Sequence, residues 1–164
     1  MIVQPLTAQA FAVFGDVIEV SEDNRHFAIN DGYTQRYHDL AKVDVSTNNG
    51  HTLINIFRST PLPLPLAIHM MERHPLSSQA FMPLGQEPYL VVVAPKGEFN
   101  PDNIKVFLAT SDQGVNYHAG TWHHFCLALN RVSDFLVIDR GGEGDNCDVV
   151  TLDGSLVIDA QQNK

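Results

Sequence analysis

Cysteine, basic residues and long apolar runs are scarce in this chain of 164 residues, and each scarcity excludes a class of protein. The two cysteines, Cys126 and Cys147, cannot make a disulfide scaffold, and they lack the paired CxxC spacing of a zinc site. No apolar run approaches the ~20 residues that a membrane-spanning helix needs. The start of the chain, MIVQPLTAQAF, lacks the basic and apolar segments of a signal peptide, so we expect a cytoplasmic protein.

The charge balance is acidic, with 10 Lys and Arg against 19 Asp and Glu and a formal net charge of −9. Such a surface repels phosphate backbones and anionic lipid, so we expect neither nucleic acid nor membrane as a partner. Hydrophobic residues make up 44% and charged residues 18%, a composition that excludes a disordered chain. The length predicts a single domain over residues 1–164.

One short helix is predicted near the N-terminus. Thr7 can cap it, Ala10, Phe11 and Phe14 form an apolar stripe, and Gly15 is expected to end it. After that point helical periodicity disappears and short β-type runs take over. These runs are Val17–Val20, Thr52–Arg58, Leu66–His74, Gln79–Met82, Tyr89–Ala94, Ile104–Ala109, Phe125–Leu129 and Phe135–Asp139.

Many short strands with almost no helix predict an all-β fold, an antiparallel sandwich or small barrel. The runs Tyr89–Ala94 and Phe135–Asp139 are apolar almost throughout, which predicts strands buried on both faces. The proline-rich stretch 61–65 cannot donate ladder hydrogen bonds and is interpreted as a connection at the rim. The glycine-rich stretch 140–146 is interpreted as a flexible loop.

Polar residues with catalytic potential begin in the run Leu66–His74. On one extended strand Ile68, Met70, Glu72 and His74 share a face, because side chains alternate. A face that starts apolar and ends with Glu and His is typical of a strand that leads from a core to a polar cavity mouth. Gln79 follows on the next predicted strand, after a turn opened by Pro75.

A second polar cluster lies between Gly114 and His124 and contains Tyr117 and His118. His123 and His124 are neighbours on a predicted strand, so only one of them can face a cavity, and parity alone does not say which. A single His or Glu at a strand end is usually a solvated or satisfied side chain. Three His and one Glu at strand ends of one small β domain favour a functional cavity.

Four arginines lie beside the β runs or turns: Arg36, Arg58, Arg73 and Arg140. Each one alone is most simply explained as a surface ion pair. An acidic protein that binds a small carboxylate nevertheless needs a local cation, and arginine can hold a carboxylate through two hydrogen bonds. Arg58 and Arg73 are the favoured candidates because their runs most clearly predict barrel strands. Cys126 is expected to pack in the interior as an inert thiol.

The two clusters resemble the two motifs of the cupin superfamily. In the first motif Glu72 stands at the first His position, His74 at the second, and Gln79 at the Glu position. The second motif ends in Gly, two residues and His, which matches Gly120 and His123. The resemblance therefore favours His123 over His124 as the inward residue.

The match to one cupin family, the ureidoglycolate lyases, is closer and runs from residue 14 almost to the C-terminus. It rests on an ordered set of short motifs: RYHDL at 36–40, ERHPL at 72–76, QAF at 79–81, GVNYH at 114–118, WHH at 122–124, DRGG at 139–142 and DNCD at 145–148. The resemblance implies a cytoplasmic, homodimeric β-barrel of the cupin type, a double-stranded β-helix or jelly roll. It also implies conversion of (S)-ureidoglycolate to glyoxylate and urea in allantoin breakdown.

The resemblance implies a divalent metal, with nickel expected, held by Glu72, His74, Gln79 and His123. Because Glu72 and Gln79 replace the usual His and Glu, we expect the metal to stimulate the enzyme without being indispensable. The reaction also needs a cation for the substrate carboxylate, a base for the carbinol hydroxyl and a donor for the departing nitrogen. The expected residues are Arg58 or Arg73 for the carboxylate, His74 or His123 with Glu72 for the base, and His118 or Tyr117 at the substrate nitrogen.

Two other functions compete with this one. The first is a metal-dependent cupin oxygenase or isomerase, which needs tightly held stoichiometric metal. The second is a non-catalytic cupin that senses a small acid, although the chain has no basic patch for DNA. Release of glyoxylate and urea from ureidoglycolate discriminates the lyase from both.

Overall fold

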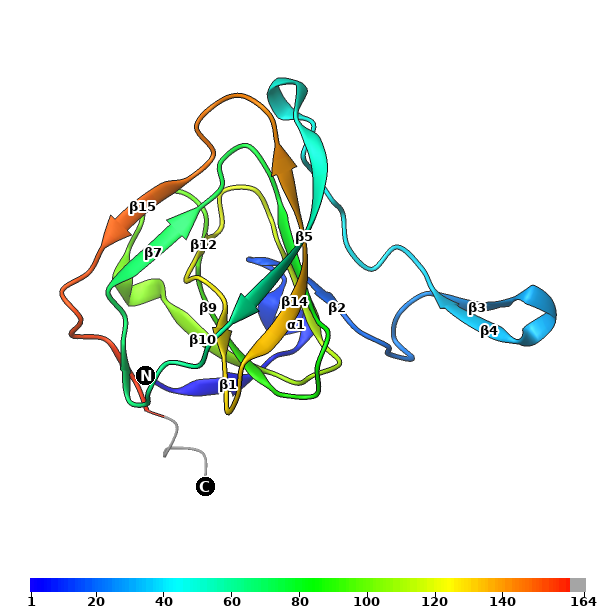
Figure 1. The fold of residues 1–164 in the computed structure, drawn as a ribbon, viewed down its shortest axis with the longest axis horizontal. Coiled ribbons are helices and arrows are strands. Elements are labelled where there is room, and N and C mark those ends of the chain that lie inside the picture. The colour runs from blue at the N-terminus through cyan, green and yellow to red at the C-terminus, as the bar shows by residue number, and fades with distance from the viewer. Residues whose placement is uncertain (160–164) are drawn as a thin grey trace.

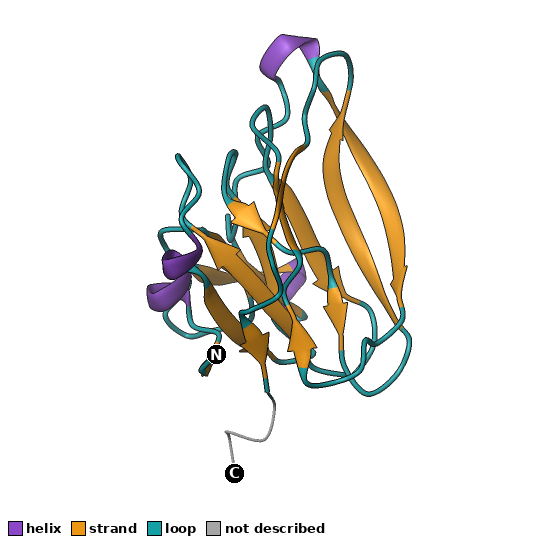
Figure 2. Cartoon of the chain, turned by 90° about the vertical axis from the view of Figure 1, so that its left-hand side faces the viewer, coloured by secondary structure: helices purple, strands orange, loops and turns teal. Residues whose placement is uncertain are grey.

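Two β-sheets packed face to face form the body of the molecule in a computed structural model, which describes residues 1–159 (Figure 1, Figure 2). The first sheet has the order β1-β10-β9-β12-β7-β15, with β13 also paired to β9, and the second has the order β2-β11-β8-β14-β5. Apart from the parallel pair β1 and β10, the ladders of both sheets are antiparallel. This arrangement confirms the all-β, cupin-like prediction.

The strands of the first sheet are β1 (Val3–Pro5), β7 (Met70–Arg73), β9 (Tyr89–Ala94), β10 (Lys105–Ala109), β12 (Trp122–His123), β13 (Leu127–Ala128) and β15 (Asp148–Thr151). Those of the second are β2 (Gly15–Ile18), β5 (His51–Ser59), β8 (Gln79–Pro83), β11 (Gly114–Tyr117) and β14 (Ser133–Gly141). Two small pairs complete the described chain: β6 (Leu66–Ala67) with β16 (Val157–Ile158), and β3 (His26–Ile29) with β4 (Thr34–Tyr37). Single 3-10 turns lie at Asn30–Gly32, Thr47–Asn49 and Pro101–Asn103.

The short helix α1 (Ala8–Phe11) forms where it was predicted, and the Thr7 hydroxyl accepts a hydrogen bond from the Ala10 amide at 3.2 Å. It ends at Phe11, so the prediction that Gly15 terminates it is wrong. Gly15 instead begins β2, where a Cβ atom would lie 1.9 Å from the carbonyl oxygen of Asn116. Glycine is required there because β2 and β11 approach each other too closely for any side chain.

Two apolar cores lie on opposite faces of the first sheet. The inner core fills the space between the sheets and includes Phe11, Phe81, Val93 and Phe135. The outer core covers the other face and includes Val92, Ile68, Met71, Trp122 and Ile158. All six residues of β9 are buried, which confirms the prediction for that strand. In β14, by contrast, only the alternate residues Phe135 and Val137 of the apolar run are buried, so the same prediction is wrong there.

The predicted strand Leu66–His74 is broken in the middle. The amide of Ile68 donates to the carbonyl of Leu156, and the carbonyl of His69 accepts from the Leu152 amide, so the C-terminal segment replaces the ladder at this point. Ile68 consequently lies in the outer core and does not share a face with Glu72. The predicted strand Phe125–Leu129 also shortens to β13, and Phe125 is 45% exposed.

A two-stranded arm stands away from the two sheets in Figure 1. It comprises β3 and β4, joined by the turn Asn30–Gly32, and no element was predicted from the sequence in this region. The stretch 61–65 contains no strand, as expected for a rim connection. Within the described residues, no helix has the length and apolar character needed to cross a membrane.

Candidate metal-binding and active site

Neighbouring strands of the first sheet bring three potential metal ligands together. Glu72 lies in β7, His74 follows the end of that strand, and His123 lies in β12 directly opposite Glu72 in the antiparallel register. One ligand atom from each of the three lies within 4.8 Å of the others. Glu72 and His74 therefore lie close together, as the alternation predicted from the sequence. The register of β7 and β12 places His123 beside them.

Both imidazoles keep one buried nitrogen without a hydrogen-bond partner. Nδ1 of His74 lies 2.6 Å from the carbonyl oxygen of Asn146, and Nδ1 of His123 lies 3.2 Å from that of His124. A carbonyl oxygen only accepts, so Nδ1 carries the proton in each ring and Nε2 keeps its lone pair. Nε2 of both residues is buried and has no hydrogen-bond partner among residues 1–159. The Nε2 lone pairs of His74 and His123 thus lie close together and accept no hydrogen bond from the described residues. A bound cation would use both of them.

His123 is held neutral by its surroundings. Burial, followed by the neighbouring His74, lowers the pKa of His123 to about 3. The ring of Tyr117 stacks on it at 4.4 Å with an interplanar angle of 7°, and burial raises the pKa of Tyr117 well above its ordinary value. The nearest carboxylate oxygen of Glu72 is 3.8 Å from His123 Nδ1. A neutral, fixed imidazole is the form that binds metal.

Gln79 reaches the same region from the second sheet, as the first residue of β8. Its side-chain oxygen is buried and, in the part of the chain that the structure describes, has no hydrogen-bond partner, like Nε2 of the two histidines. Gln79 and His74 line one cavity of about 260 Å³, together with Ser77, Asp139, Arg140, Asn146 and Cys147. Two imidazoles, a carboxylate and an amide oxygen fit a divalent cation such as nickel or zinc, so the donor set is compatible with a metal.

Arg140 is the cation of this cavity, and it was not among the favoured arginines. Its Nε and Nη2 atoms donate to the carbonyl of Thr47 at 3.1 and 2.9 Å, and Nη2 also donates to that of Glu143 at 2.8 Å. Its Nη1 group has no partner within the described residues. Arg140 is only 9% exposed, so the interpretation of 140–146 as a flexible loop is wrong at its first residue.

Asn146 fixes the other end of that loop. Its side-chain oxygen accepts from the Leu76 amide at 2.8 Å, and its nitrogen donates to Ser77 at 2.9 Å, while its carbonyl holds His74. Reasoning from single residues missed this role. The signal was present in the motif DNCD at 145–148, which the family resemblance included.

The two favoured arginines lie elsewhere. Arg58 makes a two-point ion pair with Asp134, at 2.8 and 2.9 Å, and lines a separate cavity. Arg73 points to the outer face of the first sheet, where it pairs with Asp148 at 2.8 Å and lies 4.6 Å above the ring of Trp122. Their charges are already paired, and neither residue lines the cavity of His74.

His118 and His124 also lie outside the group of three. His118 pairs with Asp16 at 3.1 Å and lines a different cavity. His124 is buried, but its Nδ1 lies 3.2 Å from the carbonyl of Phe125, and burial lowers its pKa. His123 rather than His124 thus lies beside Glu72. Cys126 packs against the inner core, and burial raises the pKa of its thiol to about 11.

A barrel of two sheets that gathers two histidines and a carboxylate from adjacent strands is a protein of the cupin class. A family model described as ureidoglycolate lyase matches residues 1–159. Relatives named ureidoglycolate lyase include one from Burkholderia cepacia, 54% identical over 96% of this chain and 89% of its own. Another, from Pseudomonas paraeruginosa, is 50% identical over 99% of this chain and 97% of its own. The chain belongs to the ureidoglycolate lyase family, which confirms the resemblance seen in its motifs.

Proposed function

We propose that this protein is a ureidoglycolate lyase that converts (S)-ureidoglycolate to glyoxylate and urea, a step of allantoin degradation. The observation that carries the proposal is the group of Glu72, His74 and His123, of which His74 lines one cavity with Arg140, in a chain of this family. The cavity of about 260 Å³ is of a size suited to a small acid. Its polar walls provide both a cation and proton-accepting groups, and the reaction requires both.

Arg140 binds the substrate carboxylate in this proposal. Three of its hydrogen bonds to the carbonyls of Thr47 and Glu143 hold the guanidinium in place and leave Nη1 free at the cavity wall. This buried guanidinium has no carboxylate partner within the described residues, and an anionic substrate neutralises its charge. Arg58 and Arg73 already have carboxylate partners, so they are not used here.

Glu72 accepts the proton of the carbinol hydroxyl. Its Oε1 atom faces His123, whereas Oε2 lies 3.9 Å from the thiol of Cys147, a residue of the cavity wall. As the hydroxyl loses its proton the C=O bond of glyoxylate forms and the C–N bond breaks. Glu72 then returns the proton to the departing urea nitrogen, so the proton count balances without a further donor. The free Nε2 atoms of His74 and His123 orient the substrate by accepting hydrogen bonds from it.

Glu72, His74, Gln79 and His123 are the residues that would hold a divalent metal, for which we propose nickel. When bound, such an ion lowers the pKa of the hydroxyl that must lose its proton. Glu72 keeps a second oxygen for that proton, so its role is the same with or without the ion. This supports a metal that stimulates the reaction without being indispensable.

The protein acts as a cytoplasmic homodimer in this proposal. The outer side of β5 and β14 carries an apolar face made of Ile54, Ile56, Leu136 and Ile138, which lie opposite one another in the register. Ile54 is 72% exposed and Ile56 is 56% exposed. A patch of this kind on an otherwise acidic molecule is typical of a surface that another protein covers.

The test is product analysis with purified protein and ureidoglycolate. We expect glyoxylate and urea in equal amounts, and ammonia in place of urea would contradict the lyase reaction. Arg140→Lys is expected to raise KM at least about tenfold, because a lysine ammonium cannot keep the bonds to Thr47 and Glu143 while it also presents a donor to the cavity. Arg58→Lys is the matched control and should leave KM unchanged. An unchanged KM in Arg140→Lys would contradict its assignment.

A further inference from the structure

The arm, residues 25–38, has no apolar core of its own. Its strands pair from His26 with Tyr37 to Ile29 with Thr34, and the base is closed by a bond from the His38 amide to the Arg25 carbonyl at 2.9 Å. Within the described residues, no hydrogen bond or ion pair joins the arm to either sheet. An isolated two-stranded hairpin is at best marginally stable in water, so this arm needs a surface to pack against.

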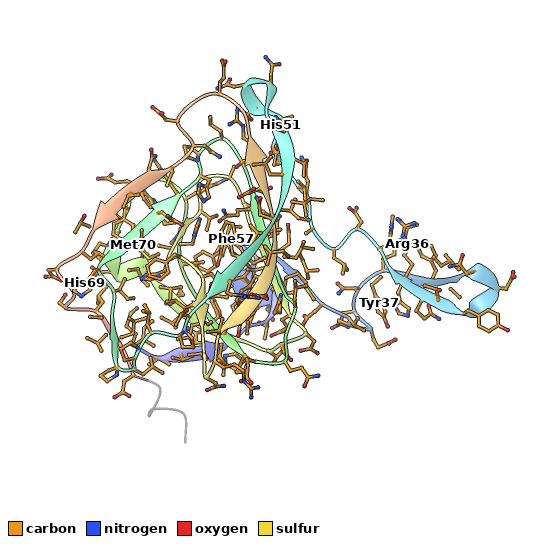
Figure 3. The ribbon with its side chains drawn as sticks, in the orientation of Figure 1. Arg36, Tyr37, His51, Phe57, His69 and Met70 are labelled. Carbon is orange, nitrogen blue, oxygen red and sulfur yellow. The ribbon has the colours of Figure 1, made fainter. Side chains whose placement is uncertain are left out.

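The chemistry of the arm differs from that of the rest of the chain. Residues 25–38 contain two arginines and one aspartate, a formal charge of +1, whereas the remaining chain carries −10. The guanidiniums of Arg25 and Arg36 lie 5.7 and 5.9 Å from the ring of Phe27, and Tyr33 at the tip is 92% exposed. Figure 3 shows Arg36 and Tyr37 far from the sheets. A cationic, aromatic arm is complementary to another copy of this acidic protein.

The apolar face of Ile54, Ile56, Leu136 and Ile138 is the surface that suits the arm of a second copy. The face spans β14 and β5, and β5 is a nine-residue strand at the edge of the second sheet whose outer edge pairs with no described strand. Long apolar edge strands favour association unless they are covered. In Figure 1 the arm extends on the same side of the molecule as β5. The outer side of β5 is therefore a surface that the arm of a second copy can cover.

We propose that the arm of each copy packs across the apolar face of the other, in a two-fold symmetric dimer. Such a contact is isologous, because the same two surfaces meet twice. The aromatic rings of Phe27 and Tyr33 cover Ile54 and Ile56 of the partner chain, and the arginines meet a molecule whose formal charge outside the arm is −10. This inference depends on the homodimer proposed above but not on the lyase reaction, so the two can fail separately.

Removing the arm tests the proposal. Because Arg25 and His38 are hydrogen bonded across its base, a two-glycine turn can replace residues 26–37 without moving the ends. Light scattering at micromolar concentration should give a dimer for the full chain and a monomer for the arm-less chain, with unchanged far-UV circular dichroism of the sheets. A dimer that persists without the arm would overturn the inference.

Point variants keep the test decisive even if the arm-less chain does not fold. Ile54→Lys and Tyr33→Ser should each raise the dimer dissociation constant, and Ile54→Lys at least about a hundredfold, because it places an unpaired charge in the contact. Val13→Lys is the matched control, since Val13 is 66% exposed but lies beside α1. Equal dissociation constants for all three would overturn the inference. A monomeric full chain would overturn both this inference and the homodimer, while a dimer without lyase activity would overturn only the proposed function.

Discussion

Two histidine–carboxylate pairs in this molecule have the same chemistry but different surroundings. His123 and Glu72 approach to 3.8 Å, and their side chains are 2% and 23% exposed. His118 and Asp16 approach to 3.1 Å, but theirs are 45% and 29% exposed. The pair of His118 and Asp16 has the shorter distance, but it is more exposed to solvent and has no second histidine beside it. Burial and unused lone pairs, rather than a short distance, mark the His123 pair as the candidate site.

The largest effect is expected from Glu72→Gln, which removes the proposed base while keeping the shape of the side chain. We expect kcat for ureidoglycolate cleavage to fall about a thousandfold, within the range that general-base catalysis contributes. Asp16→Asn is the matched control, because it makes the same change in the other pair, and its kcat should stay within about twofold of the wild type. Similar losses in the two variants would remove the distinction between the pairs.

His123→Ala separates the metal from the protein's own chemistry. We expect nickel binding, measured by titration calorimetry, to weaken at least about a hundredfold, because loss of a ligand exceeds the effect of losing an outer partner. Activity should be lost as well, while the wild type treated with a chelator keeps a reduced but measurable rate. Complete loss on chelation that only added nickel restores would show that the metal is indispensable.

Acid should destabilise the metal-free protein through its buried histidines. The pKa of His123 is about 3 in the folded state, mainly because of burial, against about 6.5 in the unfolded chain. The unfolded state therefore binds more protons below pH 6.5, and stability falls as the pH drops from 6.5 towards 3. The slope reaches about 1.4 kcal/mol per pH unit for this residue. Urea denaturation of chelated wild type and His123→Gln should show the shallower slope in the variant, and equal slopes would contradict the buried neutral imidazole.

The smallest effect is expected from His118→Ala. Its pair with Asp16 is partly exposed, so the loss should cost less than about 1 kcal/mol of unfolding free energy. The rate of ureidoglycolate cleavage should stay within about twofold, because His118 lines a different cavity from His74. A large fall in kcat with unchanged stability would restore His118 as the donor to the substrate nitrogen.

The local residue pattern predicted only those site residues that lie along one strand. Alternation placed Glu72 and His74 together, and the cupin resemblance selected His123, which the register of β7 and β12 sets opposite Glu72. Arg140 could not be selected in this way. Its position depends on the carbonyl of Thr47, 93 residues away, and on the closing of the loop by Asn146. Pairings of such long range leave no periodic signal in the sequence.

The fold was predictable from the sequence where apolar runs are long. The prediction failed where a strand is short or where a distant segment interrupts it. β9 was predicted with its bounds, because six apolar residues in succession allow no other placement in a β protein. The arm was missed because its strands have only four residues each and β3 does not alternate apolar and polar side chains, although the turn sequence Asn30–Gly32 is typical of a hairpin. Ile68 was misplaced because the C-terminal segment, far away in the sequence, interrupts the strand there.

The outer core gives the first sheet a rigidity that affects how the cavity can open. Val91 and Val93 face the inner core while Val92 faces the outer one, and all three are at most 1% exposed. Amide protons in such a strand exchange with solvent only when the whole domain unfolds. β9 and its neighbour β12, which carries His123, therefore do not open while the domain is folded. Substrate entry is left to the rim between Arg140 and Cys147, where hydrogen exchange should be fastest around the site.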